Sequence, residues 1–428
     1  MTPAQNSTPE NDLTLTLARQ ADRYVERGGH DLDLDGVLAR AGEIRRGRRM
    51  RASMVMAAVA VAVAVPLGIT VLGDDGTSSP NPPVATRSPS PKGDDSPISL
   101  DGLGTGKAPR TGYFLRDTWT SPDGTLKDDG PDSFGPTDVA VLDGGLLVVH
   151  SINGNRTVSF IDASTGKSDN SWPIGDGGLA VSPGGNVGAF VQPDGTPVVV
   201  QDAGSRYYEL PRIPISDVGG DVTQIVSVVG ENCSGRGEGA SCTVFVNQDG
   251  ETQRVWTSTT HGTAQQVDAG FKAVTAVDPT TGYTSGITDY KEDLSTCSAT
   301  QRGATALKPP SGANLWETCD YRLLQFSPDG KYLLASGSTA SGNGDSSLAV
   351  LDAVTGKVVL DLHTAENAVV VNAIWEDGTH LLANVLDSGR AAIVRISTDG
   401  TRQLAVAPVT PEDSTISPFH LPVLASED

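Results

Sequence analysis

The four cysteines are the residues of this 428-residue chain whose type and spacing most directly suggest covalent chemistry. They form two local couples, Cys233 with Cys242 and Cys297 with Cys319. The sequence has no Cys-x-x-Cys pair, and no histidine lies close to either couple, so zinc binding is not indicated. An even number of cysteines suggests two disulfides and an oxidising, exported compartment. Three pairings are open, and we favour the two local ones because each closes a short loop.

The other residue types that support catalysis form no catalytic motif. The six histidines include no i, i+4 pair and no His-Glu-x-x-His motif, so a metallohydrolase is not indicated. The sequence also lacks the Gly-x-Ser-x-Gly turn of serine hydrolases. Acidic residues are abundant, but nothing selects two as a glycosidase pair, and calcium binding at Asp128-Asp129 or Asp289–Asp293 lacks the EF-hand spacing. We therefore predict that the chain is not an enzyme and has no catalytic residue, cofactor or metal site.

Short turn sequences are the remaining candidates for ion or phosphate binding. Asp162-Ala163-Ser164-Thr165-Gly166-Lys167 returns almost unchanged as Asp352-Ala353-Val354-Thr355-Gly356-Lys357. In such a turn the Asp side chain accepts hydrogen bonds from nearby amides, and Gly supplies a positive φ. We therefore interpret these sequences as turns between strands. The five tryptophans are scattered along the chain and are expected to pack between repeats rather than form a sugar platform.

The turns recur at a regular spacing, which indicates the architecture that positions them. Residues 162 and 202 are 40 apart, and the pairs 202 and 247, and 352 and 397, are each 45 apart. From residue 109 onward, short runs rich in Val, Ile and Leu alternate with Gly, Asp and Pro, which indicates an all-β domain. A period of about 40–45 residues with four strands per unit is typical of a β-propeller.

The repeats predict the number of blades. We expect six units, near 139–174, 178–215, 221–257, 272–318, 321–363 and 371–407. Tyr113–Thr120 and Phe419–Leu424 are expected to form a shared seventh by pairing the two ends of the domain. Seven blades are therefore favoured, with six or eight as alternatives.

Two stretches resemble known families. Phe326-Ser327-Pro328-Asp329-Gly330-Lys331-Tyr332-Leu333, followed by Leu351–Lys357, resembles the blade pattern of bacterial WD40-like propellers of the exported TolB-like and YVTN type. This resemblance covers most of residues 110–425. Residues 13–60 resemble a group of actinobacterial membrane proteins that have a short helical tail and one transmembrane helix. Their genes often lie beside extracytoplasmic-function sigma factors, so the resemblance implies an anti-sigma-like or sensory role. The abundance of Ala, Gly and Val, with Arg well above Lys, suggests a high-GC genome such as that of an actinobacterium.

The segment 52–73 is predicted to be a single transmembrane helix. Its 22 residues carry no charge, and at about 1.5 Å each they span about 33 Å, enough to cross a hydrocarbon core of about 30 Å. A basic cluster precedes the segment: Arg45, Arg46, Arg48, Arg49 and Arg51. By the positive-inside rule the N-terminus is then cytoplasmic and the C-terminal domain extracytoplasmic. The stretch before the segment is too long for a signal peptide, which has about 15–30 residues in total.

These observations divide the chain into four parts. Residues 1–51 form a cytoplasmic tail with two short amphipathic helices, and 52–73 form the anchor in the cell membrane. Residues 74–108, rich in Pro, Ser and Gly, are expected to be a disordered linker. Residues 109–428 form the propeller.

Charge and the missing motifs together suggest the function. The net charge is −21, and residues 53–428 carry 22 basic against 44 acidic side chains, so the exported part should repel nucleic acid. We predict a non-catalytic binding module whose propeller face takes an envelope protein or glycan, with a tail that binds a sigma factor or another regulator. The alternative is an exported, glycosidase-like hydrolase that uses the central propeller pocket.

Overall fold

The computed structural model describes a single folded unit within the C-terminal part of the chain. The described residues are 96–128, 136–152, 155–201, 204, 206–214, 222–234, 241–249, 253–267, 270–302, 313–339, 344–411 and 417–423. The predicted tail, its basic cluster, the predicted anchor and residues 74–95 of the predicted linker lie outside them. None of the described residues belongs to a helix long and apolar enough to cross a membrane.

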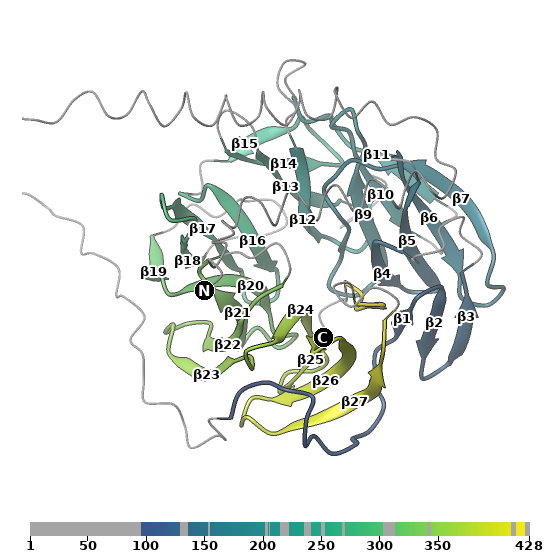
Figure 1. The fold of residues 1–428 in the computed structure, drawn as a ribbon. Helices are drawn as coiled ribbons and strands as arrows, with labels where there is room; N and C mark the ends of the chain where they lie inside the picture. Colours follow the sequence, from purple (N-terminus) through teal and green to yellow (C-terminus); the bar gives the residue numbers. More distant parts are fainter. Residues whose placement is uncertain are drawn as a thin grey trace, which may run out of the picture. The chain divides into compact units, whose positions relative to one another are not determined.

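Seven antiparallel four-stranded sheets are arranged around a central axis (Figure 1). Blade 1 consists of β4 (Asp138–Leu142), β5 (Gly145–Ile152), β6 (Asn155–Asp162) and β7 (Ser168–Pro173). Blade 2 consists of β8 (Ala180–Val181), β9 (Val187–Val191), β10 (Pro197–Gln201) and β11 (Arg206–Glu209). Blade 3 consists of β12 (Val222–Val229), β13 (Thr243–Asp249), β14 (Arg254–Thr259) and β15 (Gln265–Val267).

The next three blades follow the same order from the axis outward. Blade 4 consists of β16 (Ala273–Asp278), β17 (Tyr283–Tyr290), β18 (Thr296–Arg302) and β19 (Asn314–Thr318). Blade 5 consists of β20 (Tyr321–Phe326), β21 (Tyr332–Gly337), β22 (Ser347–Asp352) and β23 (Val358–His363). Blade 6 consists of β24 (Ala368–Trp375), β25 (His380–Asp387), β26 (Arg390–Ser397) and β27 (Arg402–Val409).

The seventh sheet, the closing blade, joins the two ends of the domain. Its strand order is β28 (Phe419–His420), β1 (Tyr113–Leu115), β2 (Thr118–Ser121) and β3 (Gly124–Lys127). The C-terminal strand β28 therefore supplies the innermost position and the N-terminal strands supply the rest. Val423 then pairs with blade 1, donating its N–H to the carbonyl of Val139 at 2.8 Å. The all-β propeller with seven blades and the pairing of its ends are confirmed.

The repeated turns have the structural role that the sequence predicts. The Asp162 carboxylate accepts hydrogen bonds from the amides of Ser164 and Thr165, each at 2.8 Å. Asp352 accepts the amide of Thr355 at the same distance in blade 5. Gly166 and Gly356 have φ values of 66° and 68°, in the left-handed region that favours glycine. The largest difference from the expected units is in blade 3, where β15 ends at Val267 instead of 257. Gln265-Gln266-Val267 carries too little apolar pattern to be identified as a strand.

Residues 96–108 correct the expected linker at its C-terminal end. Ile98 and Leu100 are 0% and 3% exposed and pack, with Leu103, against the apolar core of blades 5 and 6. Ile98 donates its N–H to the His363 carbonyl at 2.7 Å, and Gly106 donates to Leu404 at 2.8 Å. We call residues 96–108 the strap. It is ordered because three apolar side chains, spaced among polar and glycine residues, fill the outer edges of two blades.

The cysteines form the two local pairs favoured from the sequence. Cys233 is bonded to Cys242 in the β12–β13 connection of blade 3, with Cα atoms 4.9 Å apart. Cys297 of β18 is bonded to Cys319, directly after β19 of blade 4, with Cα atoms 4.0 Å apart. The disulfide in blade 4 thus ties a strand to the connection that leads into blade 5.

Candidate functional site

The innermost strands of the blades enclose a channel along the propeller axis. The channel contains a cavity of about 680 Å³, lined by residues of β8, β12, β16, β20 and β24 and by the segment after β28. Most of its wall is apolar, with side chains such as Val226, Leu324 and Ala373. Concave, largely apolar cavities with a few polar groups are the usual form of a ligand site.

Arg322, at the start of β20, is the only Lys or Arg among the described residues of the channel wall. Its Nη2 atom lies 3.2 Å from Asp345 Oδ2 and 3.4 Å from the Ser336 hydroxyl. The Arg322 Nε atom is buried and has no hydrogen-bond partner among the described residues. The guanidinium is therefore held through one nitrogen, which leaves part of its hydrogen-bonding capacity unused.

Asp138, at the start of β4, is the second ionisable group of the wall. Its carboxylate accepts the amides of Val139 at 2.9 Å and Leu179 at 3.0 Å, so it links blades 1 and 2. Burial raises the pKa of Asp138 to about 6, and the two amide hydrogen bonds and the charge of Arg156 only partly oppose this shift. Asp138 is therefore partly protonated near pH 6.

Uncharged polar side chains complete the wall. The exposed amide side chains of Gln224 and Asn372 line the channel and make no hydrogen bond with other described residues. Tyr290, at the end of β17, is 41% exposed, and partial burial together with the charge of Asp249 raises the pKa of its hydroxyl. These groups can donate to and accept from a ligand without disturbing the fold.

The remaining acid of the wall stabilises a turn. The Asp278 carboxylate accepts the Thr280 amide at 2.9 Å and the Thr281 hydroxyl. It is 4% exposed, so it is not available to a ligand in the channel.

Two of the histidines and four of the tryptophans have structural roles among the described residues. His150 contacts Asp128 inside the protein, Nε2 to Oδ2 at 3.2 Å, and His380 bonds Asp377 in the β24–β25 turn. Among the described residues no group of three or more His, Cys, Asp or Glu could hold a metal ion. Four of the five tryptophans are at most 9% exposed, as expected for packing between blades: Trp119, Trp256, Trp316 and Trp375.

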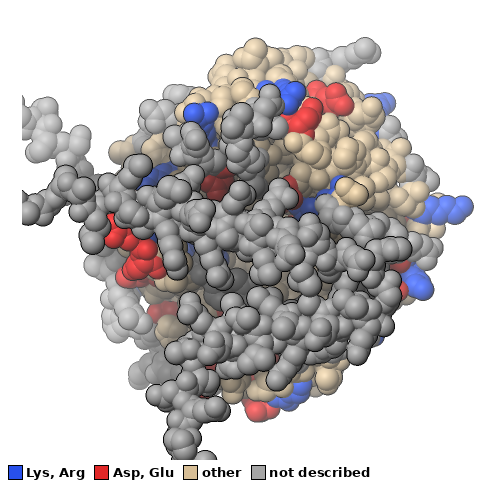
Figure 2. Space-filling view, turned by 45° about the horizontal axis from the view of Figure 1, so that its top comes forward, with Lys and Arg blue, Asp and Glu red and all other residues tan. Residues whose placement is uncertain are grey.

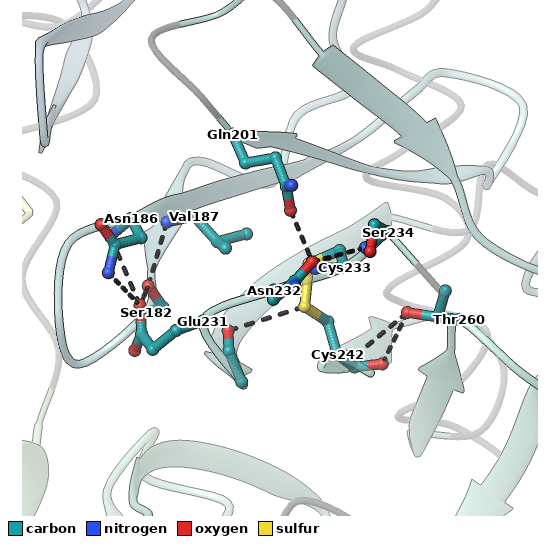
Figure 3. Close-up of a disulfide and its surroundings, with 11 residues drawn as sticks. Ser182, Asn186, Val187, Gln201, Glu231, Asn232, Cys233, Ser234, Cys242 and Thr260 are labelled. Carbon is teal, nitrogen blue, oxygen red and sulfur yellow. Dashed lines mark hydrogen bonds between the residues drawn. A yellow bond between two sulfur atoms is a disulfide. The ribbon is translucent and has the colours of Figure 1, made fainter. Parts of the chain in front are cut away.

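A second, more polar cavity lies over blade 2 and beside the Cys233–Cys242 disulfide. Its volume is about 470 Å³, and Asp143, Arg206 and Glu231 are among its lining residues. Glu231 reaches across from blade 3 and accepts the Ser182 hydroxyl at 2.6 Å (Figure 3). It also accepts the Gly184 amide at 2.8 Å. Its carboxylate is therefore committed to holding two blades together.

Acidic and basic side chains of the described residues both reach the face shown in Figure 2. On blade 4, Asp289 lies 3.0 Å from Lys291 Nζ and also bonds Lys272, and these two cations lower the pKa of Asp289 to about 2.

Sequence reasoning did not identify the channel residues. Arg322, Asp345, Gln224 and Asn372 lie on four different strands or loops and share no local motif. The blade repeat could have indicated that residues on innermost strands converge on the axis, but not which of them carry free polar groups.

Comparisons with known proteins support only the fold. No protein-family model matches the chain, and neither does any curated protein sequence. The chain is similar to the Cps50 (Swd1) β-propeller domain of Myceliophteria thermophila, at 14% identity and a TM-score of 0.42 over 68% of this chain and 98% of that one. It is similar to YCF48 bound to D1 peptide, at 12% identity and a TM-score of 0.40 over 71% of this chain and 88% of that one.

A propeller-containing enzyme is also among the similar structures. One of two prolyl endopeptidases matches at 14% identity and a TM-score of 0.45, over 73% of this chain and 49% of the peptidase. This chain therefore spans about half the length of that enzyme. The similar structures include both binding propellers and peptidases, and similarity at this level carries no argument about activity.

Proposed function

We propose that this protein is a membrane-anchored, extracytoplasmic propeller that binds a partner or ligand at its central channel without transforming it. The observation that carries the proposal is the channel wall, which is largely apolar but exposes the side chains of Gln224, Asn372 and Tyr290. The fold does not use the two amides, and an envelope protein or a glycan offers the matching donors and acceptors.

The non-catalytic part of the proposal is supported by the use of the channel carboxylates. Asp138 accepts two amides, Asp278 caps a turn and Asp345 contacts Arg322. A glycosidase needs two carboxyl groups free to face the substrate. No histidine, and no Ser or Cys beside a histidine, lines the channel among the described residues.

The binding site is tested with the full chain. We expect the Gln224→Ala/Asn372→Ala variant to capture the envelope ligand at least about tenfold less well in cross-linking from the native envelope, because hydrogen-bonding groups at the centre of a site dominate affinity. Lys357→Ala, in an exposed turn of blade 5, is the matched control. Equal capture by the wild type and both variants would contradict the channel as the site.

A hydrolase using the same channel is the second candidate, favoured by the raised pKa of Asp138. A carboxyl group with a pKa near 6 suits a general acid. Purified full chain would be assayed against glycan substrates, with Asp138→Asn as the variant. Turnover that disappears in Asp138→Asn would replace the binding proposal with the hydrolase.

The proposed membrane topology is supported by the sequence and by the disulfides. Two disulfides fit an oxidising compartment, and residues 52–73 fit a single anchor. A phosphatase reporter that is active only outside the cytoplasm should be active when fused after residue 428 and inactive when fused before residue 45. The opposite pattern would overturn the topology.

The tail could make the protein a sensor. Its support is the resemblance of residues 13–60 to tails encoded beside sigma factors, together with apolar residues at helical spacing, including Leu13 and Leu17. The full chain should co-purify with a sigma factor or another regulator, and Leu13→Asp/Leu17→Asp should abolish this. Co-purification that survives the double substitution would contradict binding through this face.

A further inference from the structure

The two disulfides differ in how accessible they are to an external thiol. Cys233 and Cys242 are both 0% exposed, and the Cys233 amide is bonded to Gln201 inside the protein (Figure 3). Cys297 is 2% exposed, but its partner Cys319 is an exposed residue. Thiol–disulfide exchange requires access to a sulfur atom. Of the two bonds, only Cys297–Cys319 includes an exposed cysteine residue, so it is the candidate for attack by an external thiol.

Cys319 lies in the connection between two blades. Cys319 and Asp320 alone join β19 of blade 4 to β20 of blade 5. The Asp320 carbonyl accepts the Ser338 amide of blade 5 at 3.1 Å. The Thr296 amide, next to Cys297, donates to the Ser338 carbonyl at 3.1 Å. The disulfide joins Cys297 to Cys319, and Ser338 is hydrogen-bonded to their neighbours Thr296 and Asp320. We call these five residues the seam between blades 4 and 5.

Two buried hydroxyls without partners among the described residues lie behind this seam. Thr300 of β18 lies opposite Trp316 of β19, so both face blade 5, where Trp316 packs against Leu323. Ser298, two residues from Thr300, shares that face. The hydroxyls of Ser298 and Thr300 are buried and have no hydrogen-bond partner among the described residues. A buried hydroxyl without a partner lowers the stability of the packed state, so the disulfide carries more of the seam's stability here.

Two residues of the channel wall lie close to the same disulfide in the sheet or in the sequence. Across the sheet, Cys297 lies opposite Asp289, and Tyr290 follows as the last residue of β17. Along the chain, Arg322 follows Cys319 by three residues and lines the channel. Tyr290 and Arg322 are therefore the channel groups placed nearest to the seam in sheet register and in sequence.

We propose that Cys297–Cys319 is a thiol–disulfide exchange site through which a dithiol sets the order of the seam between blades 4 and 5. A thiolate of the dithiol attacks the Cys319 sulfur, the bond to Cys297 breaks, and Cys297 leaves as a thiolate that takes a proton. The second thiol of the reagent then resolves the mixed disulfide and releases Cys319. The dithiol is oxidised to a disulfide, and the protein gains two electrons and two protons. The site does not depend on which ligand the channel takes.

The first experiment measures which disulfide opens. The full chain is treated with increasing dithiothreitol under native conditions, new thiols are alkylated, and the peptides are quantified by mass spectrometry. Cys297 and Cys319 should be alkylated at least about tenfold faster than Cys233 and Cys242, because only Cys319 is accessible. Equal rates, or faster reaction of the Cys233–Cys242 bond, would overturn the proposal.

The second measurement tests whether reduction of the disulfide loosens the seam. On selective reduction, amide hydrogen exchange should rise about tenfold in Thr296–Arg302 and Tyr321–Phe326 and stay unchanged in blade 6, since opening is local. The Cys297→Ala/Cys319→Ala variant should show this raised exchange without reductant. The Cys233→Ala/Cys242→Ala variant is the control and should still respond to dithiothreitol. Reduction that leaves exchange in both segments unchanged would contradict the coupling to the seam, even if the bond opens.

Discussion

Blades 4 and 6 have the same four-stranded topology but bury polar groups in opposite ways. In blade 6, Arg395 lies inside the protein beside Glu376, with side chains 7% and 0% exposed. Its Nη2 donates to Glu376 Oε1 at 2.7 Å, and its Nη1 donates to the Lys107 carbonyl at 2.8 Å. In blade 4 the hydroxyls of Thr284, Ser298 and Thr300 are buried without a partner among the described residues.

Blade 6 also contributes more buried apolar side chains to the core than blade 4 does. Blade 6 contributes buried Val, Leu and Ile residues from β25 and β26 to a core that it shares with blade 5 and the strap. The cluster that joins blades 3 and 4 has five buried members, of which only Val274 and Ala299 come from the strands of blade 4. Blade 4 adds two buried aromatic residues, Tyr283 and Trp316, to the cluster that it shares with blade 5. Blade 4, and not blade 6, carries a disulfide. We infer that cross-linking in blade 4 replaces stability that blade 6 obtains from packing and satisfied polar groups.

The largest effect is expected from removing Glu376. Glu376→Ala leaves the buried Arg395 charge without its partner and removes the acceptor of the Arg110 amide, which is bonded at 2.7 Å. Breaking one partner of a buried ion pair lowers the free energy of unfolding by about 3–5 kcal/mol. Urea unfolding of the full chain measures this value.

The control is the exposed ion pair of the strap. Arg390 Nη2 contacts Asp101 at 2.8 Å, and the two side chains are 39% and 80% exposed. Arg390→Ala should change the free energy of unfolding by less than about 1 kcal/mol, as surface pairs do. Similar losses in the two variants would show that the buried pair of blade 6 is not a major source of its stability.

The second effect is the loss of the blade 4 disulfide. Cys297→Ala/Cys319→Ala should lower the free energy of unfolding by about 3 kcal/mol, since the bond closes a loop with a sequence separation of 22. The Cys233–Cys242 bond, with a separation of 9, should contribute somewhat less. A larger loss on removing the Cys233–Cys242 bond would mean that blade 4 does not depend on its cross-link.

The fold was largely predictable because the propeller repeats its own local signals. The Asp352–Lys357 turn and the Ser327–Gly330 turn mark strand ends through side-chain and glycine chemistry that acts within a few residues. The strap was missed because Ile98, Leu100 and Leu103 pack against two blades that lie more than 200 residues away in the sequence.

The site was less predictable than the fold for the same physical reason. Arg322 and Asp345 are 23 residues apart, and the other channel groups are still more distant in the sequence. No short-range pattern indicates that a polar side chain on an innermost strand is left without a partner. Whether residues 1–95 form the predicted tail, anchor and linker stays a prediction, because these residues lie outside the described part.

A third prediction concerns Asp138, a half-buried acid whose carboxylate has partners, unlike the blade 4 hydroxyls, but no cation among the described residues paired with it as Arg395 is with Glu376. It has two amide partners, yet burial raises its pKa from 3.8 to about 6. The folded state therefore binds the proton more tightly than the unfolded state, and this stabilisation is fully present below about pH 4 and lost as the pH rises through 6. The free energy of unfolding should fall by up to about 2–3 kcal/mol between pH 4 and pH 7 because of this group.

Asp138→Asn separates this contribution from that of the other acids. Residue 138 does not titrate in the variant. The difference in the free energy of unfolding between wild type and variant should therefore change by up to about 2–3 kcal/mol between pH 4 and pH 7. Its constant offset from a weakened amide hydrogen bond does not affect the slope. Parallel pH profiles of the two proteins would show that Asp138 has an ordinary pKa in the folded state.

The smallest effects give the most direct test of the contrast between blades. Thr300→Val in blade 4 exchanges a buried hydroxyl without a partner for a methyl group of similar shape, and should raise the free energy of unfolding by about 1 kcal/mol. Val394→Thr in blade 6, at a position 0% exposed, makes the reverse exchange and should lower it by about 1–2 kcal/mol. Both are measured by urea unfolding.

If Thr300→Val is instead destabilising, the Thr300 hydroxyl has a water partner, because only the loss of a satisfied hydrogen bond would make so conservative an exchange unfavourable. Blade 4 would then hold a hydrated polar core, and its disulfide would no longer be needed to explain how the seam stays closed.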